Sequence, residues 1–338
     1  MNKKDKIRFA IIGCGHIGKR HASIIKENKE CDLAALCDTD PDKLIVFENE
    51  GVPLFNSLDS LLISDIKFDV LCIATPNGLH EEQTIKGLKS GYHIVLEKPM
   101  ALTKAGCERI IYEALQQHKH VFCVMQNRYS PSSAWIKDIV TRKVLGDIFI
   151  VQINCYWNRD EKYYVKGGWH GTRAMDGGPL FTQFSHFVDI MYWLFGDIKN
   201  IQTQFNNFNH NDLVEFEDTG VVTFDFINGG RGSISYSNSV WNKNFESTIT
   251  IIAENGTVKI GGQYMNQVEY CHIKNYEVPK LPESSAPNDY GPYKGSAANH
   301  HYVYKNVVDV LKGRETITTN ALEGLKVVEI IERIYSLK

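Results

Sequence analysis

The sequence contains no apolar run long enough to cross a membrane, no block of basic residues and no pair of cysteines in C-x-x-C spacing. A membrane-spanning helix needs about 20 mostly apolar residues, and nucleic-acid binding needs clustered Lys and Arg, whereas the formal net charge here is −3. The first residues, MNKKDKIRF, pass into an apolar run without the separate hydrophobic core of a signal peptide. We therefore expect a cytoplasmic protein with neither a membrane nor a nucleic acid as its partner.

The eight cysteines are scattered along the chain. Several stand inside apolar runs, where cysteine behaves as a small hydrophobic residue. No group of Cys and His has the spacing of a zinc site. We expect reduced thiols and no bound metal.

A glycine-rich turn follows the first apolar run. Residues 7–12 are β-rich, and Gly13, Gly15 and Gly18 come next in G-x-G-x-x-G spacing before a helical pattern. The first glycine permits a sharp turn, the second lets backbone approach a pyrophosphate, and the third lets helix and strand pack closely. Free N–H groups at the helix start favour phosphates. We predict the phosphate site of a dinucleotide here, with two further contacts from His16 and Ile17.

An acidic residue stands where such a site needs one. A second apolar run, residues 33–37, ends in Asp38, twenty residues after Gly18. A carboxylate at this distance accepts hydrogen bonds from the adenosine ribose diol. It would also repel a 2′-phosphate, and residues 39–41 hold no compensating Arg or Lys, although Lys43 is a little further on. We therefore predict NAD(H) as the cofactor.

Three more apolar runs, at 69–74, 92–97 and 120–125, alternate with helical patterns. This alternation predicts a doubly wound parallel sheet with helices on both faces. Ligands bind beyond the carboxyl ends of the strands in such sheets. The other cofactor-binding residues that we predict at this edge are Thr75, Pro76, Asn77, His80, Glu97, Lys98 and Gln126.

The alternation of strand-like runs and helical patterns stops after the run at 120–125, and this change predicts an α/β protein of two domains. Residues 1–126 would form a Rossmann domain, and 127–338 an α/β domain for substrate binding and oligomerisation. Between 199 and 273, strand-like runs follow one another without helices, which indicates an open, mainly antiparallel sheet. Such a sheet can leave one face free for a ligand or a second subunit. Residues 274–298 are rich in Pro, Ser, Gly and Asn and are predicted to form a long loop.

Two segments carry candidate catalytic groups. In Glu97-Lys98-Pro99, proline keeps the preceding residue extended, which would present Lys98 at the sheet edge to stabilise charge on a reacting oxygen. The alternative is a solvated surface lysine. In the helical pattern of residues 177–196, His186 shares a face with Thr182 and Asp189. It could act as a general base, since imidazole titrates near neutral pH. The alternative is a hydrogen-bonded packing residue.

Together these residues resemble the Gfo/Idh/MocA oxidoreductase family, which includes glucose–fructose oxidoreductase and inositol dehydrogenase. The resemblance spans nearly the whole chain and includes IIGCGHIGKRH, IATPNGLHEEQ, LEKPMALT and a GG…H…D pattern. It implies a bound nicotinamide dinucleotide, oxidation or reduction at a sugar-like carbon, and a homodimer or homotetramer formed through the second domain's sheet. By position, Lys98 matches the family's E-K-P lysine and His186 its helix histidine.

One position departs from the family pattern. Many members have Asp four residues before the histidine, where this chain has Thr182, with Gln183 beside it. A threonine can orient a hydroxyl but cannot carry a carboxylate's charge, so the proton relay is left open, with Asp189 as an alternative support for His186. This departure keeps a different class of function open, namely an NAD(H)-binding ligand sensor without efficient turnover.

Within the family, the QNRYSP and GGW…GT segments and NHHYVYKNVVDVL most resemble the nucleotide-sugar branch. That WlbA-like branch oxidises UDP-N-acetylglucosaminuronate (the UDP-N-acetyl-2-amino-2-deoxyglucuronate 3-dehydrogenases). Guanidinium groups suit a uronate and a diphosphate, since they pair with both in bidentate fashion. The alternatives are an inositol or free-sugar dehydrogenase and, for the cation-rich segment 157–176, an exposed loop with ordinary charges. We predict substrate contacts from Arg128, Tyr129, Trp169, Arg173, Gln183 and His186.

Overall fold

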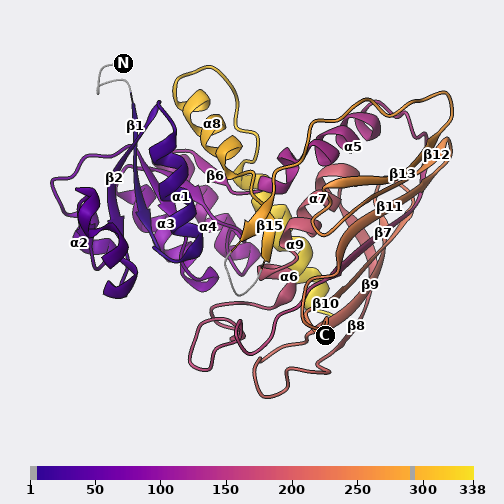
Figure 1. Cartoon of the computed structure of the whole chain (residues 1–338), viewed down its shortest axis with the longest axis horizontal. Helices are drawn as coiled ribbons and strands as arrows, with labels where there is room; N and C mark the ends of the chain where they lie inside the picture. The colour runs from indigo at the N-terminus through magenta and orange to yellow at the C-terminus, as the bar shows by residue number, and fades with distance from the viewer. Residues whose placement is uncertain (1–5, 290–293) are drawn as a thin grey trace. The chain divides into compact units, whose positions relative to one another are not determined.

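The computed structural model describes residues 6–289 and 294–338 (Figure 1). Its contacts divide the chain into two compact units. The first comprises the chain up to Val124 together with His300–Val328, and the second comprises Met125–Asn299 and Glu329–Lys338. Each unit has its own sheet.

The first unit contains a six-stranded sheet in the order β3-β2-β1-β4-β5-β6. All neighbouring strands are parallel, and Ile12 at the end of β1 pairs with both Cys37 and Ile73, so the carboxyl ends of three strands are level. The central strands are buried on both faces, as expected of a parallel sheet covered by helices. The strands are β1 (Ile7–Ile12), β2 (Cys31–Cys37), β3 (Leu54–Phe55), β4 (Val70–Ile73), β5 (His93–Leu96) and β6 (Val121–Cys123).

Amphipathic helices cover this sheet. In α1 (His16–Glu27) the buried side chains include Ala22 and Ile25, three residues apart on one helical face. The α4 helix (Lys104–Gln116) begins where the Thr103 hydroxyl accepts a hydrogen bond from the Gly106 N–H at 3.0 Å. The unit's other helices are η2 (Pro41–Lys43), η3 (Ile45–Glu50), α2 (Leu58–Leu62), η4 (Asn77–Leu79), α3 (His80–Lys89), α8 (His300–Leu311) and the first part of α9 (Ala321–Tyr335).

The return of residues 300–328 to the first unit corrects the predicted division into 1–126 and 127–338. The α8 helix buries Val303, Tyr304 and Val307, and the Tyr304 ring lies edge-on to Phe9 of β1 at 5.3 Å between ring centroids. This return could not be predicted from the sequence, because periodicity shows that a helix face is buried but not which sheet it covers.

The second unit contains a seven-stranded sheet in the order β13-β12-β11-β7-β10-β9-β8. Only β7 and β10 run parallel to each other, so the predicted α/β fold with a mainly antiparallel second sheet is confirmed. The strands are β7 (Ile148–Tyr156), β8 (Ile198–Asn206), β9 (Thr219–Phe226), β10 (Arg231–Ser237), β11 (Glu246–Ala253), β12 (Gly256–Gly261) and β13 (Gln267–Ile273).

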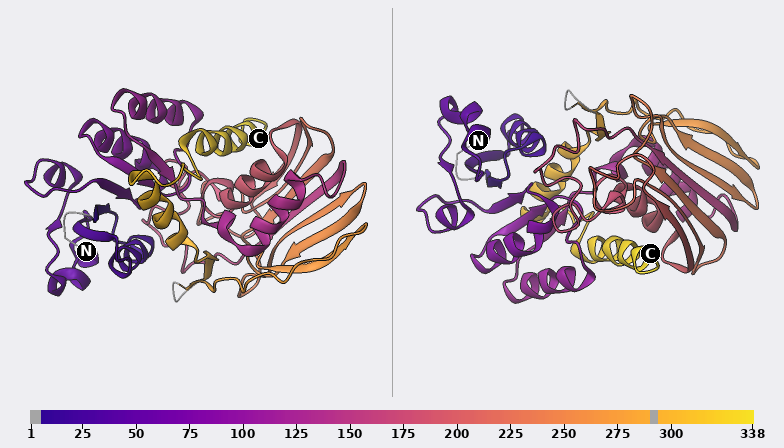
Figure 2. Two further views of the ribbon diagram at one scale, coloured as in Figure 1. Left: turned by 90° about the horizontal axis from the view of Figure 1, so that it is seen from above. Right: turned by 90° about the horizontal axis from the view of Figure 1, so that it is seen from below.

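Helices lie against one face of this sheet. Figures 1 and 2 show α5 (Pro131–Thr141) and α7 (Ser185–Phe195) on that face, and among the described residues of this unit no helix covers the other. The helix predicted over 177–196 is interrupted, since α6 (Pro179–Thr182) ends three residues before α7 begins. The predicted loop 274–298 contains a short antiparallel pair, β14 (Pro287–Asp289) and β15 (Lys294–Ala297). A further turn, η5 (Gln126–Tyr129), precedes α5.

Candidate functional site

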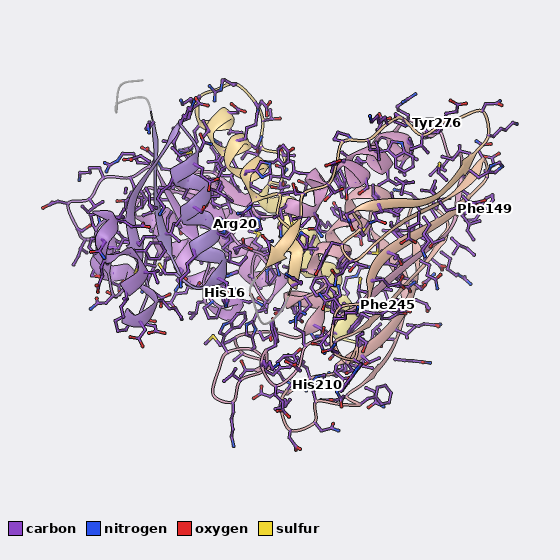
Figure 3. The ribbon with its side chains drawn as sticks, viewed as in Figure 1. His16, Arg20, Phe149, His210, Phe245 and Tyr276 are labelled. Atoms are coloured by element: carbon purple, nitrogen blue, oxygen red, sulfur yellow. The ribbon has the colours of Figure 1, made fainter. Side chains whose placement is uncertain are left out.

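The three glycines of the first turn differ in what surrounds them. A Cβ on Gly13, whose φ is +91°, would lie 2.4 Å from the Ala74 carbonyl oxygen, and one on Gly18 would lie 1.8 Å from the Gly13 oxygen. A Cβ on Gly15 would meet nothing within 4 Å. Gly15 is the N-cap of α1, and no side chain caps that helix. The turn therefore leaves open space at a helix N-terminus, which fits the phosphates of a dinucleotide. His16 and Arg20 follow on successive turns of α1 (Figure 3).

Asp38 is fixed at the end of β2. One carboxylate oxygen accepts the Cys14 N–H at 2.7 Å and the other accepts the Asp40 N–H at 2.9 Å. Each oxygen keeps a further acceptor site, so the carboxylate can also receive the hydroxyls of a ribose. The ammonium of Lys43 lies 3.8 Å from Asp38 Oδ1, so the residue that the sequence placed a little further on reaches this carboxylate.

His80 joins two loops at the same edge of the sheet. Its Nδ1 lies 2.7 Å from the Pro99 carbonyl oxygen, and its Nε2 lies 2.9 Å from the Thr75 carbonyl oxygen. The Thr75 hydroxyl in turn donates to Gln83 Oε1 at 2.6 Å. Burial lowers the pKa of His80, although the two carbonyls oppose this. With both ring nitrogens used by backbone, His80 holds the loops beside Asn77 and Lys98 in place.

Glu97 and Lys98 follow β5 directly. Glu97 is buried, and its Oε1 lies 2.9 Å from His21 Nε2, while its Oε2 accepts the Lys98 N–H at 3.2 Å. The Lys98 side chain is half-buried, and the Lys98–Pro99 peptide bond is cis. The candidate lysine thus extends from a backbone that buried groups hold on both sides.

In the second unit, His186 lies in the first turn of α7 and is 3% exposed. Its Nε2 lies 3.4 Å from the amide nitrogen of Gln126 and 3.4 Å from the hydroxyl of Ser296, and Gln126 donates to Ser296 at 2.9 Å. Gln126 was predicted as a cofactor contact, whereas Ser296 was missed because it falls in a stretch with loop composition. The cluster fixes the orientation of the candidate base.

Thr182 stands where many family members have an aspartate, but a carboxylate from a preceding turn lies beside it. The Thr182 hydroxyl donates to the fully buried carboxylate of Asp176, whose other oxygen accepts the Gly171 N–H at 2.8 Å. Asp176 was not predicted as a site residue, although its position directly before the Gly-Gly-Pro turn was a signal. The threonine that replaces the family aspartate is therefore paired with an acid from a preceding turn.

Arg128 and Asp189 form a buried ion pair. Arg128 Nη2 lies 2.6 Å from Asp189 Oδ1, Arg128 Nε lies 2.9 Å from Oδ2, and the guanidinium lies 5.3 Å from the Trp193 ring centre. The pair is bidentate, so a substrate anion would have to displace Asp189 to reach Arg128. Asp189 is correspondingly engaged by Arg128, which limits its use as the alternative support for His186.

The other predicted substrate residues are spread over different surroundings. Gln183 is buried and donates to the Tyr163 hydroxyl at 2.8 Å. The Trp169 ring lies against the neighbouring His170 ring in a tilted arrangement, with 3.7 Å between ring centres. Arg173 is exposed, and its Nε donates to the Glu215 carbonyl oxygen at 2.7 Å. Tyr129 is half-buried. Of this predicted set, Arg173 is the cation accessible to a ligand.

Within the two described ranges, no group of three or more His, Cys, Asp or Glu side chains could hold a metal ion, and no helix is long and apolar enough to cross a membrane. The eight cysteines are free. Burial raises the pKa of the Cys14 thiol, beside the glycine turn, to about 12. This thiol therefore stays protonated at neutral pH and offers no nucleophile.

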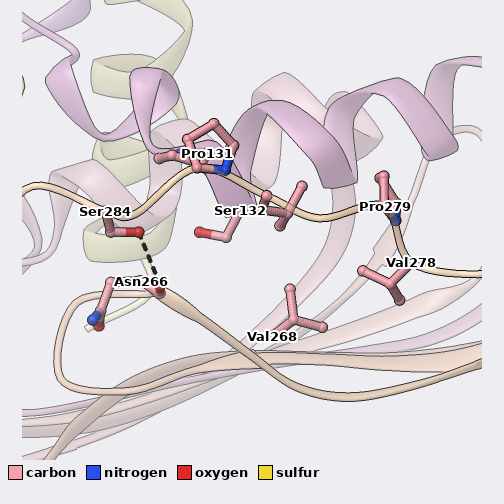
Figure 4. A pocket seen from close by; sticks show the side chains of 9 residues that line it. Pro131, Ser132, Asn266, Val268, Val278, Pro279 and Ser284 are labelled. Atoms are coloured by element: carbon pink, nitrogen blue, oxygen red, sulfur yellow. Dashed lines mark hydrogen bonds between the residues drawn. The ribbon is translucent and has the colours of Figure 1, made fainter.

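A separate hollow of about 220 Å³ lies in the second unit (Figure 4). Its wall contains the hydrogen bond from the Ser284 hydroxyl to the Asn266 carbonyl oxygen, 2.9 Å long. It has no ionisable side chain and shares no residue with the His186 cluster, so it offers no group for proton transfer. The lining residues are Pro131, Ser132, Asn266, Val268, Val278, Pro279, Leu281, Pro282 and Ser284.

Known proteins resemble the chain along most of its length. The WlbA dehydrogenases of Bordetella pertussis and Chromobacterium violaceum, both solved in complex with NADH and UDP-GlcNAcA, are 30% and 32% identical to it. Both superpose with a TM-score of 0.88, covering 98% and 99% of this chain and 96% and 94% of theirs. Oxidoreductase P35 of Formosa agariphila is 25% identical over 76% of this chain and 85% of its own length.

Two family models match the chain. Residues 7–125 match the oxidoreductase family with an NAD-binding Rossmann fold, and residues 134–259 match the GFO/IDH/MocA C-terminal domain. These ranges cover more than half of the sequence and include the glycine turn, Asp38, Lys98 and His186. The chain is therefore an oxidoreductase of the Gfo/Idh/MocA family with an NAD-binding Rossmann domain.

Proposed function

We propose that this NAD-dependent, sugar-type oxidoreductase transfers a hydride between nicotinamide and a secondary hydroxyl or keto carbon of a nucleotide sugar, namely the 3-position of a UDP-N-acetylglucosaminuronate. The observation that carries the proposal is the likeness, over nearly the whole chain, to two dehydrogenases solved with NADH and UDP-GlcNAcA. The His186 cluster supports it, because a buried and oriented imidazole suits proton transfer from a hydroxyl.

The proposed chemistry divides into a hydride and a proton. The bound dinucleotide supplies the hydride acceptor in one direction and the hydride donor in the other. In the oxidative direction the hydroxyl gives its proton to His186 Nε2 as the carbonyl forms, and Lys98 stabilises the charge that develops on the oxygen. Gln126 and Ser296 orient the imidazole. Thr182, backed by Asp176, is proposed to orient the reacting hydroxyl.

The substrate's negative charges are proposed to meet Arg173, with Tyr129, Trp169 and Gln183 around the sugar and base. The exposure of Arg173 supports its part, since a bidentate guanidinium suits either a uronate or a diphosphate. Arg128, held on Asp189, is proposed to support this region rather than to contact an anion.

The decisive assay incubates the purified protein with NAD⁺ and UDP-GlcNAcA and follows absorbance at 340 nm. His186→Ala should lower turnover by roughly 10²-fold or more while changing the NADH affinity little. His120→Ala, which removes an exposed histidine just before the amino end of β6, is the matched control and should leave turnover unchanged. Normal turnover in His186→Ala would make this histidine a packing residue.

Ligand binding tests the substrate separately. UDP-GlcNAcA should raise the melting temperature of the NADH-bound protein, and both added salt and Arg173→Ala should reduce that rise. Reduction of NAD⁺ by millimolar myo-inositol or glucose, with no effect of UDP-sugars, would replace this proposal with a simple polyol dehydrogenase. Stabilisation by UDP-GlcNAcA without any reduction would indicate a ligand sensor.

A further inference from the structure

Two buried histidines flank the Glu97 carboxylate in the first unit. Glu97 Oε1 lies 2.9 Å from Nε2 of His21 in α1 and 3.6 Å from Nε2 of His300 at the start of α8. The two histidines are 1% and 0% exposed. A carboxylate removed from water is costly unless polar partners stabilise it. Lys98 has a role in the proposed chemistry, whereas the neighbouring Glu97 carboxylate has none.

The hydrogen bonds continue away from the carboxylate. The Tyr304 hydroxyl lies 2.9 Å from His21 Nδ1, and the Cys72 sulfur lies 3.1 Å from the Tyr304 hydroxyl. Burial raises the pKa of Cys72 to about 12 and that of Tyr304 well above its usual value, so both keep their protons. A neutral His21 that donates through Nε2 accepts through Nδ1. Each group then donates a hydrogen bond to the next: Cys72 to Tyr304, Tyr304 to His21, and His21 to Glu97.

This arrangement favours the charged form of Glu97. Burial alone would raise the pKa of Glu97, but the hydrogen bond from His21 and the nearby His300 ring outweigh burial and hold it well below its usual value. Burial lowers the pKa of His300 and of His80 at the start of α3, although the charge on Glu97 opposes this lowering at both histidines. The titratable groups that interact with this carboxylate are His21 of α1, Cys72 of β4, His80 of α3, and His300 and Tyr304 of α8, and Lys98 follows it directly in the chain.

We propose that Glu97 is a positioning residue that keeps the neighbouring Lys98 in its ammonium form and fixes its backbone at the end of β5. This inference rests on the proposed function, in which Lys98 stabilises charge on the substrate oxygen. The Glu97 carboxylate lies 3.2 Å from the Lys98 backbone nitrogen, and a nearby negative charge favours the protonated form of a lysine side chain. The Glu97 contact with the Lys98 N–H and the His80 contact with the Pro99 carbonyl hold the chain before and after the Lys98 side chain.

The direct test measures the protonation of Lys98 without cofactor or substrate. Trace acetic anhydride acetylates only unprotonated amines, and mass spectrometry of the Lys98 peptide gives the pH midpoint of its reactivity. Glu97→Gln keeps the side chain's shape and removes its charge, so this midpoint should fall by about one pH unit. The control Glu108→Gln removes a carboxylate of α4 whose side chain is 56% exposed, and it should leave the midpoint unchanged.

If Glu97→Gln does not fold, His21→Phe is the variant that tests the role of Glu97. His21→Phe keeps a flat ring of similar size but removes both nitrogens, so Glu97 loses its hydrogen bond and its pKa should rise. The acid limb of turnover with UDP-GlcNAcA and NAD⁺, which otherwise reports the proposed base His186, should then move to higher pH and become steeper, because Glu97 must be deprotonated as well, while NADH affinity stays near that of the wild type. Failure of both variants to fold would reject the inference, because the group would then serve the fold alone.

The outcomes separate this inference from the proposed function. An unchanged Lys98 midpoint in a folded Glu97→Gln variant overturns the inference and leaves the proposed chemistry standing. Normal turnover in Lys98→Met overturns the role of Lys98 in that chemistry, whichever way the midpoint moves. A lowered midpoint together with an inactive Lys98→Met supports both.

Discussion

Two glycines of the same turn should respond in opposite ways to one added methyl group. Gly18→Ala places a Cβ 1.8 Å from the Gly13 oxygen, so it should destabilise the first unit by about 3 kcal/mol. Gly15→Ala meets no atom within 4 Å, so the fold should persist while the methyl occupies the space proposed for phosphate. Urea unfolding and fluorescence titration with NADH measure the two effects. A stable Gly18→Ala, or unaltered NADH affinity in Gly15→Ala, would contradict this division of roles.

Asp38 should set the choice between the two nicotinamide cofactors. The wild type should bind NADH more tightly than NADPH, and Asp38→Ala should narrow the gap by roughly tenfold, because it removes an anion and releases Lys43 toward a 2′-phosphate. The exposed Asp42→Ala is the control and should leave the ratio unchanged. Titration of each variant with both cofactors measures the ratio. Equal affinities in the wild type would refute the assignment.

At the scale of elements, Asp218 ties down the loop before β9. Its carboxylate accepts from His210 Nδ1 at 2.9 Å and from the N–H groups of Phe208 and Asn209, and Figure 3 labels His210 in this loop. Burial opposes the charge, but these three donors prevail and hold the pKa of Asp218 below its usual value. The stability that depends on this charge is therefore present above about pH 4, the pKa of an unfolded Asp, and is lost as pH falls toward the folded-state pKa.

Asp218→Asn should consequently lower the free energy of unfolding by about 2 kcal/mol at pH 7. The difference from the wild type should shrink as pH falls below about 4, because Asp218 of the unfolded wild-type chain then takes up a proton that the folded protein does not bind. Urea unfolding at pH 7, 5 and 3.5 gives this difference directly. A difference that stays constant with pH would mean that shape, not charge, holds the loop.

The elements that sequence predicted well are those with local signatures. Strand, glycine turn and Asp38 stand within a short stretch, and their chemistry depends on spacing along the chain. The interruption after Thr182 was not predictable, since the apolar pattern continues through Phe184 on both sides of it. The pairs Asp176–Thr182 and Arg128–Asp189 were not predictable from the sequence either, because the partner of a side chain depends on packing, which spacing along the chain does not encode.

For the whole molecule, the uncovered face of the second sheet predicts self-association. Apolar side chains on four of its strands are 41–53% exposed, and the strand register places them on one face, namely Ile150, Val221, Ile252 and Tyr270. Exposed apolar surface of this kind marks an interface. We expect a homodimer or homotetramer that buries this face.

Light scattering after size exclusion tests this expectation. Paired Ile150→Glu and Ile252→Glu, which face each other across β7 and β11, should lower the measured mass toward that of one chain. Ile63→Glu, at an exposed position of the first unit, is the control and should leave the mass unchanged. A wild type that is already monomeric would refute the prediction.

The return of α8 to the first sheet has a consequence for how the protein is made. Residues 125–299 are inserted between the two parts of the first unit, and Tyr304 and His300 arrive only after them. A ribosome therefore releases β1 and α1 long before α8, the helix whose Tyr304 packs against Phe9 and His21. During that interval the emerging chain exposes an unfinished core, and contacts this far apart in sequence form slowly. Chaperones can act on this exposed core until residues 300–328 have been synthesised.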